Sequence, residues 1–393
     1  MADRERGRRL LFVVHSEYPV GEVRVRRQAE AAAAAGWRVD VLALASEGAP
    51  PFELVGDCRV YRTRVARRRD FRLGGLFGEY GRFFAATLQH CRRHRYDRVV
   101  VANPPDFLVF AVLGERLRGA RVLLDIHDLM TDLYALRASG RSRRLAPLLR
   151  ALEFLSMATA DELLTVHEPY AAEVRRRCHG LRRVTVVMNS ADPRWFNADA
   201  RHAGAEGAAT GPAFAFYGSL FERNGLRDLI EAFDQVAATH ESCELWIWGD
   251  GDAREALLAL AGASPARDRI SFSAGMRPSE EIAEMLTRAG FCVVPNLPDL
   301  HNAKALSCKL LEAAAVGVPV IAGDLAVTHG HFDDDEVLFY EAGDPAALAE
   351  AMVHALDHPD EMVEQARRAR ERYERDYSWD AQARRFLEAL DRT

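Results

Sequence analysis

Apolar residues in the first half of the chain form short continuous runs, and longer stretches with helical spacing separate them. Such runs are typical of parallel strands that are buried on both faces. After the first run, helical spacing continues to Ala35 and is followed by Gly36, the residue type that most often ends a helix. We predict strands over residues 10–14, 37–43, 98–102, 121–126, 162–166 and 184–188.

The same alternation restarts after residues 198–212, a small and polar segment whose glycines and alanines are typical of a connector between domains. Strands that alternate with helices predict a parallel sheet, and two such series predict an α/β protein with two doubly wound, Rossmann-like domains. Ligands are expected at the carboxyl ends of the strands, in a cleft across which the two domains face each other. The second series covers residues 213–217, 244–248, 270–273, 291–294, 319–322 and 337–340.

The two series set the predicted domain boundaries. We predict a first domain over residues 1–195, a linker over 196–212 and a second domain over 213–375. The last residues, 376–393, are predicted to form a helix that packs back on the first domain.

The composition, with 49% apolar and 28% charged residues, is that of an ordinary globular protein and excludes a largely disordered chain. No apolar stretch approaches the roughly 18 residues that cross a bilayer, and the run at Leu10–Val14 is too short for a secretory signal. The six cysteines form no C-x-x-C pair, so we predict a cytoplasmic protein without a zinc site or a disulfide framework.

Charge is distributed unevenly. Residues 1–190 carry 33 arginines and 22 acidic residues, a net of +11, whereas residues 191–393 carry 19 basic and 36 acidic residues, a net of −17. Either the two domains attract each other, or the basic half meets an anionic partner such as a phosphorylated acceptor or a membrane surface. Nucleic acid is not expected, because the arginine runs at 67–69 and 175–177 lack interleaved aromatic residues and suit solvated helix faces.

One segment of the basic half, residues 137–157, leaves two interpretations open. Its leucines either face the core of the first domain or form the apolar side of a basic helix that contacts an anionic membrane. The segment includes Arg141, Arg143, Arg144 and Arg150 among Leu145, Leu148, Leu149, Leu152 and Leu155.

Two helix starts are candidate anion sites, because a helix N-terminus offers free N–H groups and a partial positive charge. The first follows Gly249 and Gly251, but a dinucleotide fingerprint would need a third glycine where the chain has Arg254. A nicotinamide oxidoreductase is therefore not expected, and a plain tight turn explains this segment equally well. The second start, near residue 307, lies among Lys304 and Lys309, the two lysines of the chain.

Two further motifs carry candidate chemistry. His127 and Asp128 follow the strand LLDI, where a ligand-facing loop is expected, although a histidine there can also cap a helix or bond the backbone. The acidic run Asp333 to Asp335 is predicted to cap a turn, and we predict no metal site.

The motifs together resemble those of the family 4 retaining glycosyltransferases, which have the two-domain GT-B fold. In the first half, LLDIHDLM and VVMNSADPRWF resemble the family's histidine-bearing loop and the segment that closes its first domain. In the second half, FYGSLFERNGLRDLIEAF, LWIWGDGDAREAL, ISFSAGM and KLLEAAAVGVPVIAGD resemble its nucleotide-binding motifs. The resemblance covers nearly the whole chain.

The resemblance implies roles for individual residues. His127 is expected to contact the sugar or phosphate, and Lys309 is expected to stabilise the leaving diphosphate. Glu312 would accept hydrogen bonds from the ribose hydroxyls, a role that suits an ionised carboxylate. Arg24 and Asn189 are implied on the acceptor side. The other residues expected to bind the donor are Gly21, Gly218, Ser219, Arg223, Asn224, Gly251, Met276, Lys304, Leu306, Ser307 and Cys308.

Three positions depart from the family pattern. Ser219 and Asn224 stand where the family commonly has an arginine and a lysine that hold the donor pyrophosphate. Lys304 stands where the first of two glutamates belongs, whereas Lys309 fits a variant with a lysine three residues before the retained Glu312. These changes bear on the choice of donor sugar and on whether activity is kept.

The implied function is retaining transfer of a sugar from a nucleotide-diphospho-sugar to a hydroxyl of a small-molecule, glycan or lipid-linked acceptor, without a further cofactor. Two alternatives stay open. One is an NDP-sugar 2-epimerase of the same fold, and the other is a non-catalytic protein that binds nucleotide sugars. The protein is expected to be a monomer or a homodimer, with peripheral membrane contact as an open prediction.

Overall fold

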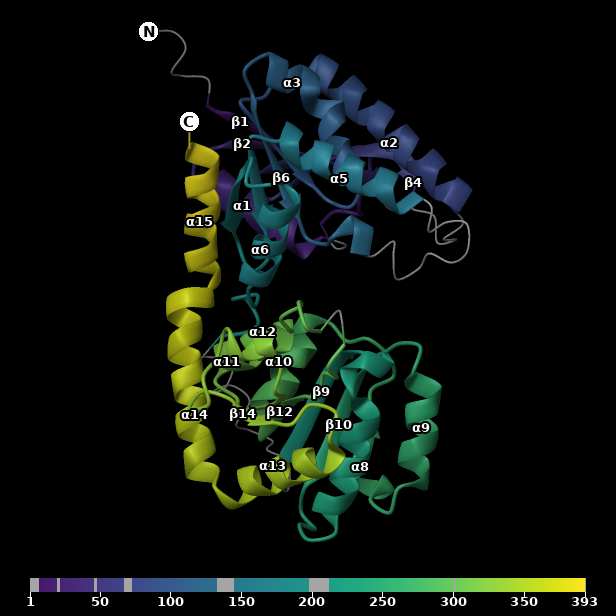
Figure 1. The fold of residues 1–393 in the computed structure, drawn as a ribbon, viewed down its shortest axis with the longest axis vertical. Coiled ribbons are helices and arrows are strands. Elements are labelled where there is room, and N and C mark those ends of the chain that lie inside the picture. The colour runs from purple at the N-terminus through teal and green to yellow at the C-terminus, as the bar shows by residue number, and fades with distance from the viewer. Residues whose placement is uncertain are drawn as a thin grey trace. The chain divides into compact units, whose positions relative to one another are not determined.

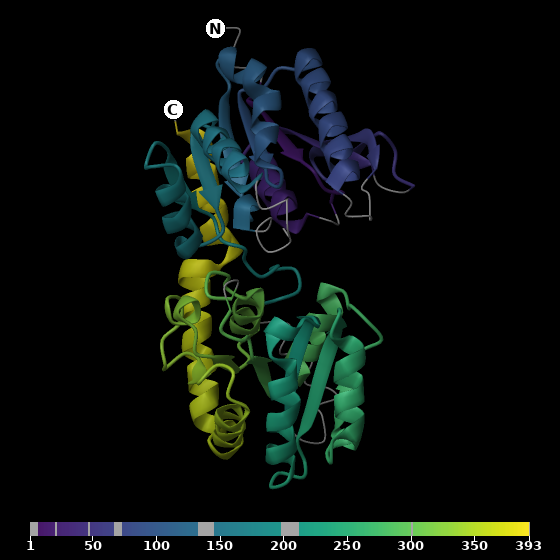
Figure 2. The same cartoon turned by 45° about the vertical axis from the view of Figure 1, so that its right-hand side comes forward.

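The chain folds into two units, each built around its own sheet (Figures 1 and 2). Unit 1 comprises Met1–Asn189 and Gln382–Thr393, and unit 2 comprises Ser190–Ala381. The predicted fold class, an α/β protein with two doubly wound domains, is confirmed. This computed structural model describes residues 7–19, 22–45, 48–66, 73–132, 145–197, 212–299 and 302–392.

The sheet of unit 1 has eight strands. They are β1 (Arg9–Val14), β2 (Arg38–Ala45), β3 (Phe52–Val55), β4 (Cys58–Ala66), β5 (Arg98–Ala102), β6 (Arg121–Ile126), β7 (Glu162–Thr165) and β8 (Arg183–Val186). Their order is β3-β4-β2-β1-β5-β6-β7-β8, and all neighbours are parallel except β3 and β4. This edge hairpin lies outside the predicted set, because β4 (CRVYRTRVA) alternates polar and apolar residues and has no continuous apolar run.

Alternate residues of β1 enter two different cores. The helices of this part of unit 1 are α1 (Val23–Ala34), α2 (Leu73–Arg93), η1 (Asp106–Val112), α3 (Leu113–Leu117), α5 (Ala146–Thr159) and α6 (Glu168–Arg177). Leu11 packs with Phe83 of α2 on one face, and Phe12 packs with Val25 of α1 on the other. The predicted helix end is confirmed, because α1 stops at Ala34 and Gly36 follows with φ +87°.

The sheet of unit 2 has six parallel strands in the order β11-β10-β9-β12-β13-β14. They are β9 (Ala213–Ser219), β10 (Glu244–Asp250), β11 (Ile270–Phe272), β12 (Phe291–Val294), β13 (Val320–Gly323) and β14 (Leu338–Tyr340). All six match predicted strands to within a few residues. The helices are η3 (Glu222–Asn224), α8 (Leu226–Ala237), α9 (Arg254–Ala263), η4 (Arg267–Arg269), α10 (Ser279–Arg288), α11 (Cys308–Val316), α12 (Ala326–His329), α13 (Pro345–Asp357), α14 (Pro359–Arg372) and η5 (Tyr373–Tyr377).

The last helix, α15 (Trp379–Asp391), ends in unit 1. Phe386 and Leu390 are fully buried in the core that contains Phe12. The side chain of Gln382 accepts a hydrogen bond from the Met188 N–H at 2.9 Å. Cationic side chains close the helix C-terminus, where free carbonyls carry partial negative charge, and Arg98 Nε donates to the Leu390 carbonyl at 2.8 Å.

The boundary between the units lies at Asn189 and Ser190, earlier than residue 195, and unit 2 extends to Ala381. Most of the predicted linker falls on residues 198–211, outside the described part of the chain. Among the described residues, no helix combines the length and apolar character that crossing a bilayer requires.

We predict that Phe386→Ala destabilises unit 1. Removing a fully buried ring leaves a cavity in the core shared with β1, so the free energy of unfolding should fall by about 3–5 kcal/mol. Urea unfolding measured by pulse proteolysis reports this change. The matched control is Arg385→Ala, an exposed position on the same helix, which should stay within about 0.5 kcal/mol of the wild type. Equal effects of the two substitutions would contradict this account of α15.

Candidate functional site

In unit 2, backbone segments approach very closely at the carboxyl ends of β9, β10 and β12. A Cβ on Gly249 would lie 1.8 Å from the Gly218 carbonyl oxygen, and a Cβ on Gly225 would lie 1.9 Å from the Pro295 carbonyl oxygen. Gly225 also has φ +66°, a conformation that favours glycine. These glycines therefore allow the loops after the three strands to meet at one edge of the sheet.

The turns after β10 and β11 are joined by Arg254. Its guanidinium donates to the Gly249 carbonyl at 2.8 Å and to the Ser273 carbonyl at 2.6 Å. The Ser273 hydroxyl accepts from the Gly249 N–H at 2.9 Å and donates to the Gly275 carbonyl at 2.6 Å. Arg254, which stands where a dinucleotide fingerprint needs a glycine, thus has a structural role: it links the two turns by hydrogen bonds. It supports the turn at Gly251 and the loop in which Met276 is exposed.

Helix α11 begins at this edge, directly after Ser307. The Ser307 side chain makes no capping hydrogen bond to the helix, Cys308 is exposed, and Gly317 ends the helix with φ +78°. A helix start of this kind offers backbone N–H groups and a positive partial charge to an anion. The preceding residues are held by buried Asn302, whose amide donates to the Leu297 and Arg223 carbonyls at 2.9 Å each.

The lysine of α11 lies against β9. Lys309 Cε is 3.3 Å from the position that a Cβ on Gly218 would take, and its Nζ is 4.8 Å from the centre of the Phe216 ring. Burial lowers the pKa of Lys309, while the neighbouring Cys292 and Glu312 oppose that shift. A half-buried cation therefore sits beside the helix start.

Glu312, one turn further along α11, is oriented by Tyr217. The buried Tyr217 hydroxyl donates to Glu312 Oε2 at 2.7 Å. Burial and the nearby carboxylate raise the pKa of Tyr217 well above its usual value, so the tyrosine stays a hydrogen-bond donor. Glu312 itself is half-buried, and a carboxylate has two oxygens that can accept hydrogen bonds.

The positions that depart from the family pattern, and Arg223 beside one of them, have different environments, and Ser219 is half-buried. Asn224 is buried, and its side chain donates to the Ser219 carbonyl at 2.6 Å, which closes the turn after β9. Arg223 is exposed and its guanidinium lies 4.6 Å from the centre of the Phe221 ring. Lys304 is half-buried in the segment before α11, as is Leu306. The Asn224 side chain thus holds the loop, whereas Arg223 presents a charge at its surface.

In unit 1, His127 directly follows β6 and lies beside a buried carboxylate. Its Nε2 is 3.2 Å from Asp125 Oδ2, and its Nδ1 is 3.9 Å from Glu22 Oε1. Asp125 also accepts from Gln28 Nε2 at 2.8 Å and from both Arg24 Nε and Nη2, at 3.0 and 2.8 Å. Burial would raise the pKa of Asp125, but Arg24 and His127 outweigh it and hold that pKa far below its usual value.

The predicted acceptor-side pair, Arg24 and Asn189, lies together in unit 1. Arg24 Nη1 donates to Asn189 Oδ1 at 3.2 Å and to the Val187 carbonyl at 2.5 Å. The other nitrogens of this guanidinium donate to Asp125. The buried Arg24 therefore connects Asp125 with the backbone at Val187 and with Asn189. Gly21 lies outside the described residues.

Asn103, which follows β5, holds the backbone of the His127 loop. Its Oδ1 accepts from the His127 and Asp128 N–H groups at 2.6 and 3.3 Å. Its Nδ2 donates to the Asp128 carbonyl at 2.6 Å and to Asp106 Oδ1 at 2.8 Å. Sequence reasoning missed Asn103, Gln28 and Tyr217. The sequence signal for each is weak: Asn103 follows a strand, Tyr217 lies near the end of a strand, and Gln28 is a polar residue on the buried face of α1.

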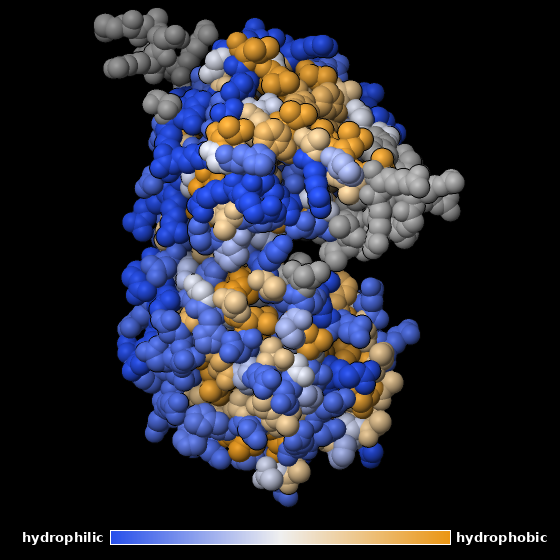
Figure 3. Space-filling view, viewed as in Figure 1, coloured by the Kyte–Doolittle hydropathy of each residue, from blue (hydrophilic) through white to orange (hydrophobic). Residues whose placement is uncertain are grey.

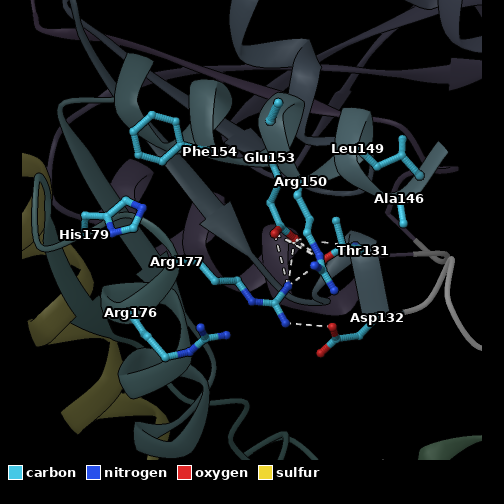
Figure 4. Close-up of a pocket in the computed structure, with 11 residues that line it drawn as sticks. Thr131, Asp132, Ala146, Leu149, Arg150, Glu153, Phe154, Arg176, Arg177 and His179 are labelled. Carbon is cyan, nitrogen blue, oxygen red and sulfur yellow. Dashed lines mark hydrogen bonds and ion pairs between the residues drawn. The ribbon is translucent and has the colours of Figure 1, made fainter. Parts of the chain in front are cut away.

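Unit 1 also has a pocket of about 510 Å³ between α5 and α6 (Figure 4). Arg177 points into its centre, where its guanidinium donates to Glu153 at 3.1 Å, to Thr131 at 2.6 Å and to Asp132 at 2.7 Å. The prediction that residues 175–177 form a solvated face is therefore wrong for Arg177. The pocket is lined by Thr131, Asp132, Ala146, Leu149, Arg150, Ala151, Glu153, Phe154, Arg176, Arg177 and His179.

Two Rossmann-like units, one with a lysine and a carboxylate at a helix start, define a two-domain α/β protein with a candidate site at the carboxyl edge of a sheet. The family model "Glycosyl transferase 4-like domain" matches residues 21–191, and "Glycosyl transferases group 1" matches residues 211–358. The chain belongs to this glycosyltransferase family, and its fold is GT-B. The resemblance seen in the sequence is confirmed.

Among curated relatives, glycogen synthase of Mycobacterium tuberculosis is 29% identical over 241 residues, 59% of this chain and 54% of that protein. Phosphatidyl-myo-inositol mannosyltransferase of Mycobacterium leprae is 31% identical over 183 residues, 46% of each chain. The chain thus spans about half the length of the curated relatives it matches.

Two solved structures have the same fold. Sucrose-phosphate synthase from Thermosynechococcus elongatus superposes with a TM-score of 0.78 at 20% identity, covering 97% of this chain and 98% of that one. Anabaena HepE, solved with UDP and glucose, superposes with a TM-score of 0.70 at 14% identity, covering 98% and 99%.

The buried carboxyl beside Asn103 gives a pH-dependent prediction. Burial raises the pKa of Asp106 to about 7, whereas an unfolded aspartate titrates near pH ~3.9. The folded chain therefore binds this proton more tightly, so the contribution of Asp106 to stability is present at low pH and is lost as pH rises through 7. Relative to the wild type, Asp106→Asn should gain roughly 2–3 kcal/mol in free energy of unfolding between pH 5 and pH 7.

Urea unfolding of both proteins at the two pH values tests this expectation. Asp268→Asn, whose side chain is 90% exposed, is the control and should follow the wild type at both pH values. Parallel pH dependence of wild type and Asp106→Asn would show that this carboxyl does not titrate in the range.

Proposed function

We propose that the protein is a retaining glycosyltransferase whose donor is a nucleotide-diphospho-sugar. The arrangement of Tyr217, Glu312 and Lys309 at the start of α11 carries this proposal. It combines an oriented carboxylate, which suits ribose hydroxyls, with a cation and a helix start one turn away, which suit a diphosphate. A related fold solved with UDP and glucose supports this choice of ligand.

The donor-binding roles extend to the neighbouring residues. We assign the pyrophosphate to the N–H groups at Ser307 and Cys308, with Arg223 and Lys309 as cations and with Gly218 allowing the close approach. Ser219, Asn224 and Gly251 are assigned to the walls of the donor site, and Met276 is assigned to the contact with the base. Lys304 and Leu306, in the segment before α11, are assigned to the sugar end of the donor.

The proposed reaction breaks the bond between the anomeric carbon and the diphosphate oxygen, and it forms a bond from that carbon to the acceptor oxygen. The acceptor attacks on the face that the diphosphate leaves, and the leaving phosphate oxygen takes the acceptor proton. Negative charge grows on that oxygen as the bond breaks. Lys309, Arg223 and the helix start would stabilise it as fixed electrostatic groups that need no reorganisation.

We assign His127 to the transferred sugar or to the phosphate. Its orientation comes from Asp125, which Arg24 and Gln28 keep ionised and fixed. An acceptor with a hydroxyl nucleophile, of the small-molecule, glycan or lipid-linked class, completes the reaction, with Arg24 and Asn189 on its side of the site.

A thermal-shift panel of UDP-, GDP-, dTDP- and ADP-sugars identifies the donor base, because a ligand that binds only the folded state stabilises it more as affinity rises. Release of nucleoside diphosphate only when an acceptor is present supports transfer. Release without any acceptor favours the 2-epimerase, and donor binding without release across a broad acceptor panel favours a non-catalytic binding protein.

We predict that Glu312→Ala weakens donor binding. The substitution removes a carboxylate that would make charge-assisted hydrogen bonds to ribose, worth roughly 1.5–3 kcal/mol, or about 10- to 150-fold in Kd. Calorimetric titration with the donor found in the panel measures this loss. The control is Glu255→Ala on α9, which should bind as the wild type does. An unchanged Kd in Glu312→Ala would remove Glu312 from the donor site.

Lys309→Ala is expected to lower kcat more than donor affinity, because charge on the leaving oxygen is greatest in the transition state. A fall in kcat of tenfold or more, about 1.4 kcal/mol, is the expected result. Arg227→Ala, an exposed cation of the same unit, is the matched control. Steady-state kinetics with saturating donor separate the two effects, and a kcat within about twofold of the wild type would refute the role of Lys309.

A further inference from the structure

Helix α5 buries a carboxylate and exposes leucines. Leu148 is 66% exposed and Leu155 is 53% exposed, whereas Glu153 is only 4% exposed. Figure 3 shows apolar residues gathered over α3 and α5, so the interpretation in which the leucines face the domain core is wrong for these two. A buried carboxylate is costly unless it is paired and hydrogen-bonded, whereas a buried leucine would stabilise the core. The inward position of Glu153 therefore depends on the partners that it meets inside unit 1.

The main partner of Glu153 is Arg177, the last residue of α6, which also reaches other residues (Figure 4). Its Nη1 donates to Glu153 Oε2 at 3.1 Å and to Thr131 Oγ1 at 2.6 Å. Its Nη2 donates to Asp132 Oδ1 and its Nε donates to Glu173 Oε1, both at 2.7 Å. Burial would lower the pKa of Arg177, but these acidic partners outweigh it and raise that pKa. Arg177 thus joins two helices to residues 131 and 132.

Residues 129–132 form a single turn that Glu153 also holds. Glu153 Oε1 accepts from the Thr131 N–H at 3.4 Å and from its hydroxyl at 3.1 Å. The turn is closed by the Asp132 N–H, which donates to the Leu129 carbonyl at 3.0 Å, and Leu129 is buried in the core of unit 1. The Arg177–Glu153 pair and the core therefore fix this turn at its two ends.

The turn directly follows the segment of His127, whose N–H donates to Asn103 Oδ1 at 2.6 Å. The Asn103 anchor and the Arg177–Glu153 pair are electrostatically connected. Burial raises the pKa of Asp106, the carboxyl that Asn103 contacts, while Glu153 raises it further and Arg177 lowers it. Charges shift a pKa in this way only when they lie close. The continuous segment 127–132 is thus held from two neighbouring sides.

We propose that Arg177, acting with Glu153, is a positioning residue for His127. A guanidinium meets several acceptors in fixed directions, so it can link two helices and a loop where a lysine could not. A shift of the turn moves the imidazole, and a misplacement of about 1 Å can cost roughly 100-fold in rate. Arg176 has no such connection, since it is 71% exposed and, of the described residues, hydrogen-bonds only Glu173. The inference rests on the proposed role of His127 in sugar transfer.

Steady-state kinetics of two neighbouring variants test the inference. Arg177→Met should lower kcat about tenfold or more, with a smaller change in KM, because it misplaces a group beside the reacting bond. The matched control, Arg176→Met, removes only a contact to Glu173 and should keep kcat within about twofold of the wild type. In a His127→Ala background, Arg177→Met should lower kcat by less than about twofold, because its effect passes through His127.

A second variant separates positioning from stability. Arg177→Met leaves Glu153 buried without its cation, which destabilises the fold. Arg177→Met with Glu153→Gln removes both charges and keeps an amide oxygen that can accept from Thr131. Its melting temperature should return toward that of the wild type while kcat stays low. A recovery of kcat together with stability would assign the pair a merely structural role.

The position of His127 is also measured without turnover, by NMR of protein with isotope-labelled histidine. The ring resonance that His127→Gln removes should shift in the Arg177→Met, Glu153→Gln variant and stay in place in Arg176→Met. An unshifted resonance, or an equal loss of kcat in the His127→Ala background, overturns the inference. A wild type that transfers no sugar overturns the proposed function instead, and the NMR comparison then still decides whether Arg177 positions His127.

Discussion

The buried ion pair between Arg24 and Asp125 is the interaction on which the organisation of unit 1 depends. It connects α1 with the end of β6, and the same guanidinium reaches the backbone after β8 at Val187. A buried carboxylate is stable only when it is paired and hydrogen-bonded, and here Arg24 and Gln28 donate to Asp125 while His127 Nε2 lies 3.2 Å from it. The orientation of His127 is thus a consequence of how this charge is neutralised.

The candidate site of unit 2 is built differently, because there a lysine and a helix start lie together at a sheet edge. Glycines let three loops converge, and the start of α11 adds the partial charge of a helix terminus to that of Lys309. Burial shifts the pKa of Lys309 down, and the nearby Glu312 opposes the shift. Tyr217, fixed as a donor by its raised pKa, keeps Glu312 in one orientation without adding charge.

The sequence predicted the parts of the fold that depend on continuous apolar runs, and it missed those that do not. The parallel strands of both units were found, whereas the edge hairpin β3–β4 was not, because alternating arginines remove the signal. The helix start at Lys309 was predicted from the clustering of two lysines and from family resemblance. The roles of Asn103 and Asn302 could not be predicted. Each is a single asparagine whose side chain hydrogen-bonds to loop backbone, and a single residue of this kind forms no recognisable pattern in the sequence. The leucines of α5 show the same limit: their helical spacing is visible in the sequence, but Leu148 and Leu155 are exposed whereas Glu153, paired with Arg177, is buried.

The place of α15 has a consequence for synthesis on the ribosome. Unit 2 is contiguous in sequence, from Ser190 to Ala381, so all its strands have emerged before the final helix is made. Unit 1 begins first but obtains Phe386 and Leu390 only from residues translated after unit 2. Its apolar surface around Phe12 therefore stays uncovered while about two hundred further residues are polymerised, which takes roughly 10–40 s at bacterial or eukaryotic elongation rates. During that interval the nascent first half lacks part of its own core.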